Sequence, residues 1–292
     1  QRQMRDLTKN LKDPYLQEMS ELGTEDGIVE DDNEEVLDDP CFRPVIVTGA
    51  NEESVQQLRN LIGSVHKNEP TLSLVVYDLG LDKETIKELR GYCNISLFKF
   101  PFQEFPSFFD DLSLFARVPI VLRHALQHDA QCIVYLDPSK TINGSIEAIK
   151  EDLGRDGYWF TSSGENFPKR VEPGTKVVFP GLGEASFSGM DKLISASVMG
   201  WKNNTFAQAE LLETLAEWSV TMRPEDYAKA EQRPDQIALN YFVYAPGAFK
   251  EQVLKRGEQF KVHQESTSML SMRGSTLSKY SSFICKKGAL PH

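Results

Sequence analysis

The chain has 292 residues, of which 40% are hydrophobic and 26% charged, which is enough for a folded core and excludes disorder throughout. Its net charge is -11, but nine acids without a base lie in residues 25–39 alone, so the rest of the chain is nearly neutral. Because nucleic-acid binding needs clustered Lys and Arg and no basic stripe is present, the composition also excludes nucleic acid as a partner.

The first forty residues differ in composition from the rest. Residues 1–40 lack a sustained apolar stripe, contain the acidic run and end in Asp39-Pro40. This pattern is typical of a solvated stem or linker, and an acidic docking segment is the alternative. No apolar run reaches the 18 residues needed to cross a bilayer, and Gln1 is not a natural start. We therefore expect membrane contact only through a transmembrane helix that this sequence does not contain.

From Cys41 onward, strand and helix patterns alternate. Strands are predicted at residues 44–48, 73–78, 95–100 and 132–136, and helices at residues 53–66, 83–92 and 112–128. Such alternation predicts an α/β fold: a mostly parallel sheet, similar to a Rossmann fold, with helices on both faces. After Thr141 the periodicity weakens, with helices expected at residues 205–218 and 234–244. We interpret residues 41–292 as one large domain, with a nucleotide-binding half (41–140) and an acceptor-side half (141–292).

Four cysteines, Cys41, Cys93, Cys132 and Cys285, show no metal-ligand spacing and leave one or two disulfides open. The tripeptides that begin at Asn94, Asn143 and Asn203 match the acceptor pattern for N-glycosylation. Such tripeptides also arise by chance, so alone they do not decide between a secretory protein and an intracellular one.

An apolar strand, CIVYL, stops abruptly on Asp137. Open α/β sheets bind ligands at the carboxyl ends of their strands, so this acid is our first candidate for a metal or diphosphate site. The Pro138 turn would hold it rigidly, and Ser139 could add an uncharged hydroxyl ligand. The alternative is that Asp137 only ends the strand or caps a helix.

Arg117 stands before the same strand, in a predicted helix. Its guanidinium offers a planar fork of donors that suits a diphosphate, although surface arginines are common. Thr48, Asn51 and Asp78 lie at the ends of the first two predicted strands, where a nucleoside would rest in such a fold. These three assignments to substrate binding follow from topology and not from residue chemistry.

Asp235 and Gln236 open the helix predicted at residue 234. An acid at this point is stabilised by the helix dipole, which alone would explain it. The functional interpretation makes the two residues catalytic, as polar groups near the transferred sugar or as a base for the acceptor hydroxyl.

Three histidines bear on metal binding. His263 follows a strand-like stretch and could complete a metal site with Asp137 and Ser139, or could be a structural histidine. His124 and His128 are four residues apart on one helix, and the neighbouring leucines predict that both face solvent.

Several segments together resemble a glycosyltransferase-like family of animals, largely expanded in nematodes, with a nucleotide-diphospho-sugar transferase domain. The resemblance covers roughly residues 41–270 and is carried by Pro44-Val-Ile-Val-Thr-Gly-Ala, Val76-Tyr-Asp-Leu-Gly-Leu, Phe98-Lys-Phe-Pro-Phe, Val134-Tyr-Leu-Asp-Pro-Ser and Arg233-Pro-Asp-Gln-Ile-Ala-Leu-Asn. More distantly, Ala116-Arg117, Tyr135-Leu-Asp and Asp235-Gln236 look like the glycogenin and galactosyltransferase superfamily, which has the GT-A fold.

The resemblance implies a lumenal enzyme of the Golgi or endoplasmic reticulum, anchored as a type II membrane protein. It would move a sugar from a nucleotide-sugar donor to a hydroxyl of a glycan or protein acceptor. Arg117 and Asp137 would hold the donor, with Mn²⁺ or Mg²⁺ at Asp137. The metal motif departs from Asp-x-Asp because position 139 is Ser. A non-catalytic binding or scaffold protein that keeps the fold is therefore the alternative.

Overall fold

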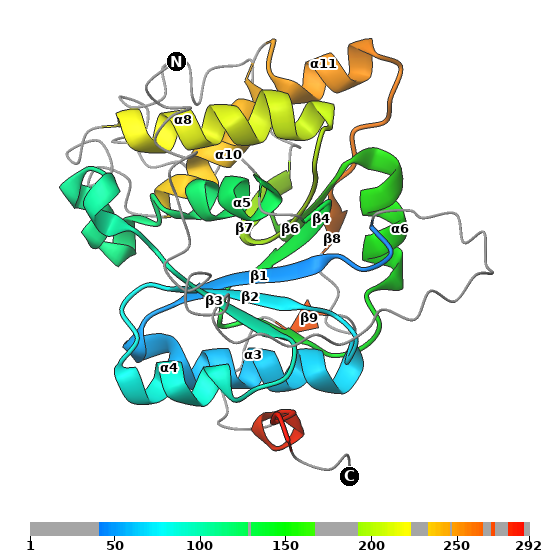
Figure 1. Ribbon diagram of the computed structural model, residues 1–292. Coiled ribbons are helices and arrows are strands. Elements are labelled where there is room, and N and C mark those ends of the chain that lie inside the picture. The colour runs from blue at the N-terminus through cyan, green and yellow to red at the C-terminus, as the bar shows by residue number, and fades with distance from the viewer. Residues whose placement is uncertain are drawn as a thin grey trace.

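A seven-stranded sheet with the order β3-β2-β1-β4-β7-β6-β8 forms the centre of the molecule (Figure 1). The computed structural model describes residues 41–127, 130–166, 192–222, 233–245, 247–264, 270–271 and 280–288, so the predicted stem lies outside the described residues. The strands are β1 (Val45–Ala50), β2 (Leu74–Asp78), β3 (Ile95–Lys99), β4 (Cys132–Leu136), β6 (Tyr158–Asn166), β7 (Lys192–Lys202) and β8 (His263–Gln264). A separate pair joins β5 (Thr141–Ile142) to β9 (Leu270–Ser271).

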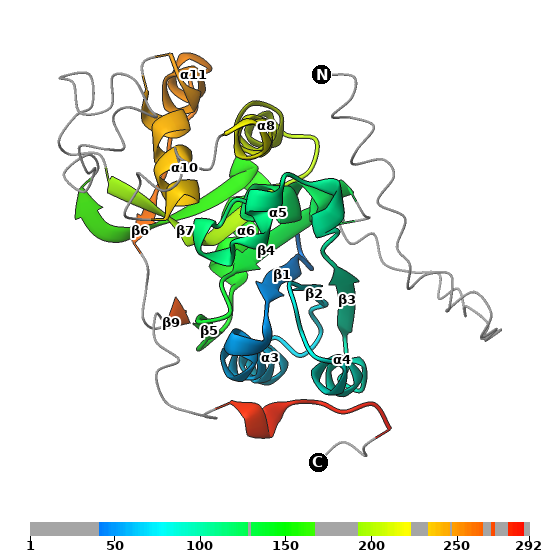
Figure 2. The ribbon, with the colours of Figure 1, turned by 90° about the vertical axis from the view of Figure 1, so that its left-hand side faces the viewer.

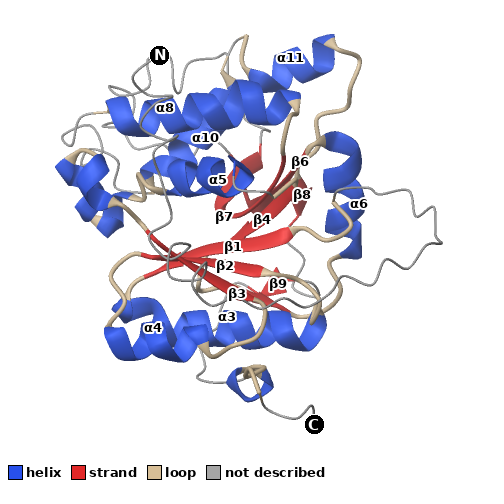
Figure 3. Ribbon diagram, viewed as in Figure 1, coloured by secondary structure: helices blue, strands red, loops and turns tan. Residues whose placement is uncertain are grey.

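Helices cover both faces of this sheet (Figure 3). On one face lie α3 and α4, and on the other α5, α8, α10 and α11, as the two perpendicular views agree (Figures 1 and 2). A further helix, α6, packs against β6 and β7. The helices are α3 (Val55–Asn68), α4 (Lys83–Arg90), α5 (Val118–Gln127), α6 (Glu147–Asp156), α8 (Glu213–Thr221), α10 (Pro234–Tyr244) and α11 (Phe249–Lys255), with a π-helical turn at Gln208–Leu212.

The central strands bury both of their faces. Ile46 on β1 and Val134 on β4 pack into the cluster under α3, whereas Val47 and Tyr135 pack into the cluster under α5. Because successive side chains of a strand point to opposite faces, each of these strands needs apolar residues throughout. This explains why both read as continuous apolar runs in the sequence.

The predicted α/β fold with a mostly parallel sheet and helices on both faces is confirmed. Strands β1, β2, β3 and β4 pair in parallel, as do β6 and β8. The sequence did not predict β6 and β7. These two strands are antiparallel neighbours, and β7 also pairs with β4 in the antiparallel direction. The second half of the chain therefore extends the sheet of the first half.

The prediction that His124 faces solvent is wrong, while His128 lies outside the described residues. His124 is 6% exposed, and its Nδ1 lies 2.6 Å from the hydroxyl of Tyr77. The helix α5 packs against β1 and β4 on one side and α8 on the other, so almost all of its surface is buried. No helix among the described residues combines the length and apolar character needed to cross a bilayer.

Two disulfides join all four cysteines. Cys41–Cys132 links a residue four positions before β1 to the start of β4, and Cys93–Cys285 links the turn before β3 to the C-terminal segment. In Figure 2 this segment, drawn red, passes below α3 and α4. Both of the disulfides that the sequence left open are thus present.

Candidate functional site

The sheet order reverses at β1, and a cavity opens there. The chain winds from β1 outward to β3, then returns through α5 to place β4 on the other side of β1. Ligands of open α/β sheets bind at such switch points, beyond the carboxyl ends of the strands. A cavity of about 330 Å³ lies at this edge. Its lining comes from the strand ends and from the turns before α3 and α5 and includes Gly49, Asn51, Phe115, Arg117, Tyr135 and Asp137.

Asp137 is fixed by its own turn. Its Oδ1 accepts hydrogen bonds from the Ser139 N–H at 3.1 Å and the Ser139 hydroxyl at 2.8 Å. Its backbone N–H donates to Ser197 on β7 at 2.9 Å. An aspartate whose side chain accepts a hydrogen bond from the backbone two residues later forms a stable turn. This turn uses Oδ1 of Asp137 and leaves the second oxygen, Oδ2, directed away from it. The side chain is 20% exposed and can meet a ligand.

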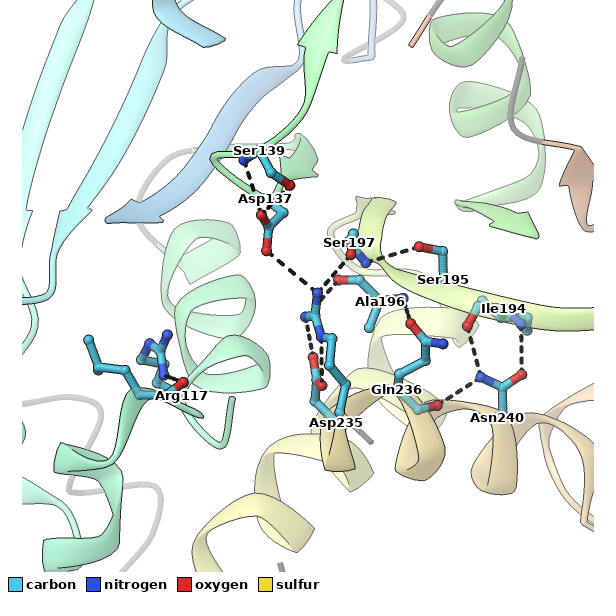
Figure 4. A network of polar contacts seen from close by, with 12 residues as sticks. Arg117, Asp137, Ser139, Ile194, Ser195, Ala196, Ser197, Asp235, Gln236 and Asn240 are labelled. Carbon is cyan, nitrogen blue, oxygen red and sulfur yellow. Dashed lines mark hydrogen bonds and ion pairs between the residues drawn. The ribbon is translucent and has the colours of Figure 1, made fainter. Parts of the chain in front are cut away.

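Arg233, to which the sequence assigned no role, joins Asp137 to Asp235. Its Nη1 lies 3.5 Å from Asp137 Oδ2, while Nε and Nη2 bind both oxygens of Asp235 at 3.1 and 2.7 Å. Nη1 also donates to the Ser197 hydroxyl at 2.7 Å. Figure 4 shows Asp137, Ser197 and Asp235 facing one another across this network. Burial acts to lower the pKa of Arg233, but the charge and hydrogen bonds of Asp235, together with Tyr135 and Asp137, outweigh burial and raise it.

Two side-chain amides of α10 form hydrogen bonds with the backbone of β7. Strand β4 pairs with β7 only from Val198 onward, so the backbone of Ile194 and Ala196 lies outside this ladder. Asn240 donates to and accepts from the backbone of Ile194, and Gln236 accepts from the Ala196 N–H at 3.2 Å (Figure 4). Buried backbone groups must be paired, so both amides have a clear structural role. The proposed catalytic role of Gln236 stays a prediction.

Arg117 lies in the turn before α5 and not within a helix, which corrects the helix predicted at residues 112–128. Phe115 has a left-handed backbone (φ 54°) that interrupts the helical path. Arg117 is 8% exposed and donates from Nη1 to the Leu112 carbonyl at 2.8 Å. Burial lowers its pKa, and the nearby Tyr135, Asp235 and Asp137 act in the opposite direction. It lines the cavity but stands apart from the Arg233 network (Figure 4).

The other predicted substrate-binding residues differ in their surroundings. Asn51 lines the cavity, where its Oδ1 accepts from the Ser54 hydroxyl. Thr48 is 0% exposed inside β1 and does not line it. Asp78 accepts the N–H groups of Gly80 and Leu81 and borders a neighbouring cavity of about 620 Å³ under α4. The structure therefore brings Asn51, Arg117 and Asp137 together but not Thr48 or Asp78.

The proposed metal ligands do not form a site. His263 lies on β8, and two strands, β7 and β6, separate it from β4 and Asp137. Its Nε2 lies 3.5 Å from Asp152, and its ring stacks on Trp159. Ser139 is close to Asp137, but its hydroxyl donates to that carboxylate. Across the part of the chain that the structure describes, no cluster of three His, Cys, Asp or Glu residues could hold a metal ion.

The comparisons with known proteins agree with this fold. A family model described as a protein of unknown function, DUF1647, matches residues 16–123, less than half of the chain. No curated protein matches the sequence.

Solved structures with similar folds are glycosyltransferases. Mouse xyloside xylosyltransferase 1 is 11% identical with a TM-score of 0.50, over 80% of this chain and 98% of that one. Core-mannan synthase A of Aspergillus fumigatus, in its Mn/GDP form, is 10% identical with a TM-score of 0.51, over 84% and 76% of the two chains. At such identities the comparisons establish the fold, which is similar to that of GT-A glycosyltransferases.

Proposed function

We propose that this protein is a glycosyltransferase that moves a sugar from a nucleotide-sugar donor to a hydroxyl of a glycan or protein acceptor. The observation that carries the proposal is the cavity at the switch point between β1 and β4, with Asp137 and Arg117 in its wall. The fold shared with two sugar transferases supports the same conclusion.

The chemistry of such a transfer suits the charges at this edge. The acceptor oxygen bonds to the anomeric carbon of the sugar while the bond from that carbon to the diphosphate breaks, and the hydroxyl proton passes to the departing diphosphate or to water. Negative charge grows on the diphosphate, so a fixed positive charge beside it lowers the barrier. Arg117 is placed in the cavity wall to supply such charge, and its planar guanidinium can bind two phosphate oxygens at once.

We also propose a secretory compartment, the lumen of the Golgi or endoplasmic reticulum. Both disulfides support it, because disulfides persist in oxidising compartments. The exposed Asn94, in one of the three glycosylation tripeptides, is compatible with modification there. A type II membrane anchor would precede the acidic segment.

The test is donor binding and turnover in the purified protein. Unfolding temperature is measured with UDP, GDP and their common sugar conjugates, since a ligand at 100 times its dissociation constant stabilises the native state by about 2.7 kcal/mol. For a donor that binds, we expect Asp137→Asn to lower kcat/KM about 100-fold or more, because it removes a charge that orients the site, with the unfolding temperature unchanged.

Asp152→Asn is the matched control. Asp152 is also an aspartate paired with an arginine, Arg155, but it lies on α6, away from the cavity. We expect full activity from this variant. Equal activity of Asp137→Asn and wild type would refute the placement of the site.

A non-catalytic binding protein is the second candidate, favoured by the absence of a second acid at Ser139. It predicts that no nucleotide in the panel shifts the unfolding temperature of the wild-type protein, with or without a divalent metal.

A further inference from the structure

We propose that Arg233 takes the place of the divalent metal at this site, so that donor binding needs no metal. The inference rests on the proposed function, because it concerns the diphosphate of the same donor. Its evidence is the position of one guanidinium between two carboxylates.

The carboxylates that a metal would use are already bound to this arginine. Asp235 gives both oxygens to Arg233, at 3.1 and 2.7 Å, and Asp137 faces Nη1 with the oxygen that Ser139 leaves free. A cation at Asp137 would therefore stand within a few ångströms of a guanidinium and be repelled by it. The donor set does not fit a metal while Arg233 is in place.

The charges balance without a metal. Asp137 and Asp235 carry two negative charges, and Arg233 and Arg117 carry two positive ones. A divalent cation added to these four side chains would bring their net charge to +2. The guanidinium also supplies directed N–H donors, which can bind phosphate oxygens in a fixed geometry.

Packing holds Arg233 in this position. Its guanidinium carbon lies 4.0 Å from the centre of the Phe115 ring, and Arg117 lies 5.7 Å from the same ring. Phe115, Asp137 and Arg117 line the cavity. Arg233 is not part of this lining but contacts Phe115 and Asp137, so its charge lies next to the space where the diphosphate would lie. The Arg233 side chain is 19% exposed, which leaves part of it open to a ligand, whereas Asp235 behind it is 2% exposed.

The sequence around Arg233 favours this geometry. Pro234 begins α10, and Asp235 follows in its first turn, where the helix dipole stabilises an acid. The two side chains can therefore pair across a single residue, and Asp235 acts through Arg233 as a positioning residue. The bond to Ser197 then fixes the arginine against β7.

The first measurement is Mn²⁺ binding by calorimetry, which does not depend on any nucleotide. We expect no Mn²⁺ binding to the wild-type protein. Arg233→Ala leaves Asp137 and Asp235 facing each other without a cation, so we expect this variant to bind one Mn²⁺. The double variant Arg233→Ala with Asp137→Asn should lose that binding. A metal site in the wild-type protein, or none in Arg233→Ala, would overturn the inference.

The second measurement is nucleotide binding in EDTA and in Mn²⁺. For whichever of UDP and GDP binds, we expect the wild-type dissociation constants in the two buffers to agree within about threefold. Binding by wild type that appears only with Mn²⁺ overturns the inference while leaving the proposed function intact. Failure of both nucleotides in both buffers refutes the proposed function, and the metal titration then decides about Arg233 alone.

Arg233→Lys covers the case in which the alanine variant does not fold. Lysine keeps a cation between the two acids but cannot bind both oxygens of Asp235 as a planar fork. We expect it to stay free of Mn²⁺ and to bind the nucleotide about tenfold more weakly in EDTA. Mn²⁺ binding by this variant would count against the proposal.

Discussion

Asp137 and Asp235 have the same functional group in different surroundings. The Asp137 side chain is 20% exposed and keeps one oxygen directed toward Arg233 and the cavity edge, while that of Asp235 is 2% exposed. A general base needs a lone pair within reach of the proton that it takes. Both oxygens of Asp235 accept hydrogen bonds from Arg233. Of the two roles that the sequence left open, positioning or general base, this geometry favours positioning.

Thr48 is a residue whose burial argues against substrate binding. Its hydroxyl is fully buried and has no hydrogen-bond partner among the residues that the structure describes. An unpaired buried hydroxyl destabilises the folded state, so Thr48→Val should leave the free energy of unfolding unchanged or raise it by up to about 1 kcal/mol. Nucleotide affinity should be the same in both proteins. Chemical denaturation and calorimetry measure the two quantities.

Ser64→Ala is the control for Thr48→Val. Ser64 is equally buried, but its hydroxyl donates to the Leu61 carbonyl at 2.7 Å and accepts from the Ile142 N–H at 3.0 Å. We expect this variant to lose about 1 to 3 kcal/mol of stability, because it leaves a buried N–H unpaired. Weaker nucleotide binding by Thr48→Val would instead restore Thr48 to the site.

At the scale of elements, the C-terminal segment 280–288 is attached to α3 by specific polar contacts. Tyr280 donates from its backbone N–H to Asn60 at 3.0 Å, and its hydroxyl donates to Asn143 at 2.8 Å. Gly63 allows the approach, since a Cβ there would lie 1.9 Å from the Tyr280 carbonyl oxygen. His66, near the end of α3, lies 3.0 Å from the backbone of both Cys93 and Cys285.

These contacts require neutral His66. Its Nδ1 accepts from the Cys285 N–H, so Nε2 carries the proton and donates to the Cys93 carbonyl. Burial lowers the pKa of His66 below its usual value, and the Cys93 carbonyl opposes this in part. The stabilisation is therefore complete above the unfolded pKa of about 6.5 and is lost as the pH falls toward the lower folded pKa.

We expect the free energy of unfolding to fall by up to about 2 kcal/mol between pH 6.5 and pH 5, measured by chemical denaturation. The variant His66→Gln keeps a hydrogen-bond donor and an acceptor but does not titrate. We therefore expect its free energy of unfolding to fall less than that of the wild type over this pH range. Identical pH profiles for the two proteins would show that His66 is not responsible.

At the scale of the whole molecule, local patterns predicted the first half of the sheet and failed in the second. β1, β2 and β4 are short apolar runs between turns, which single them out. β7 is buried on both faces but contains Ser195, Ser197 and Gly200, so it shows neither alternation nor a continuous apolar run. Its partners on β4 lie more than sixty residues away along the chain, beyond the reach of any local pattern.

The same limit applies to the site. Asp137 was found because a strand end is a local signal, and Asp235 because a helix start is one. Arg233 lies 96 residues from Asp137, and only the assembled sheet shows that they meet. His263 was misplaced for the same reason, since its position depends on β6 and β7.

The two disulfides should respond differently to a reductant. Cys41 and Cys132 are 0% and 1% exposed, whereas Cys285 lies on the exposed C-terminal segment. Thiol exchange needs access to a sulfur, so we expect dithiothreitol to reduce Cys93–Cys285 first under native conditions, as measured by alkylation and mass spectrometry. Reduction of both disulfides at equal rates would contradict this order.

The exposed disulfide closes the larger loop. Its cysteines are 192 residues apart, compared with 91 for the buried one, so its loss frees more of the unfolded chain. Replacing Cys93 and Cys285 together with serine should lower the free energy of unfolding by about 2 to 5 kcal/mol. The cavity is lined at the start of α3, whereas the disulfide lies near the end of this helix. We therefore expect the nucleotide affinity of this variant at 25 °C to equal that of the wild type. Affinity that falls together with stability would instead show that the C-terminal segment supports the donor site.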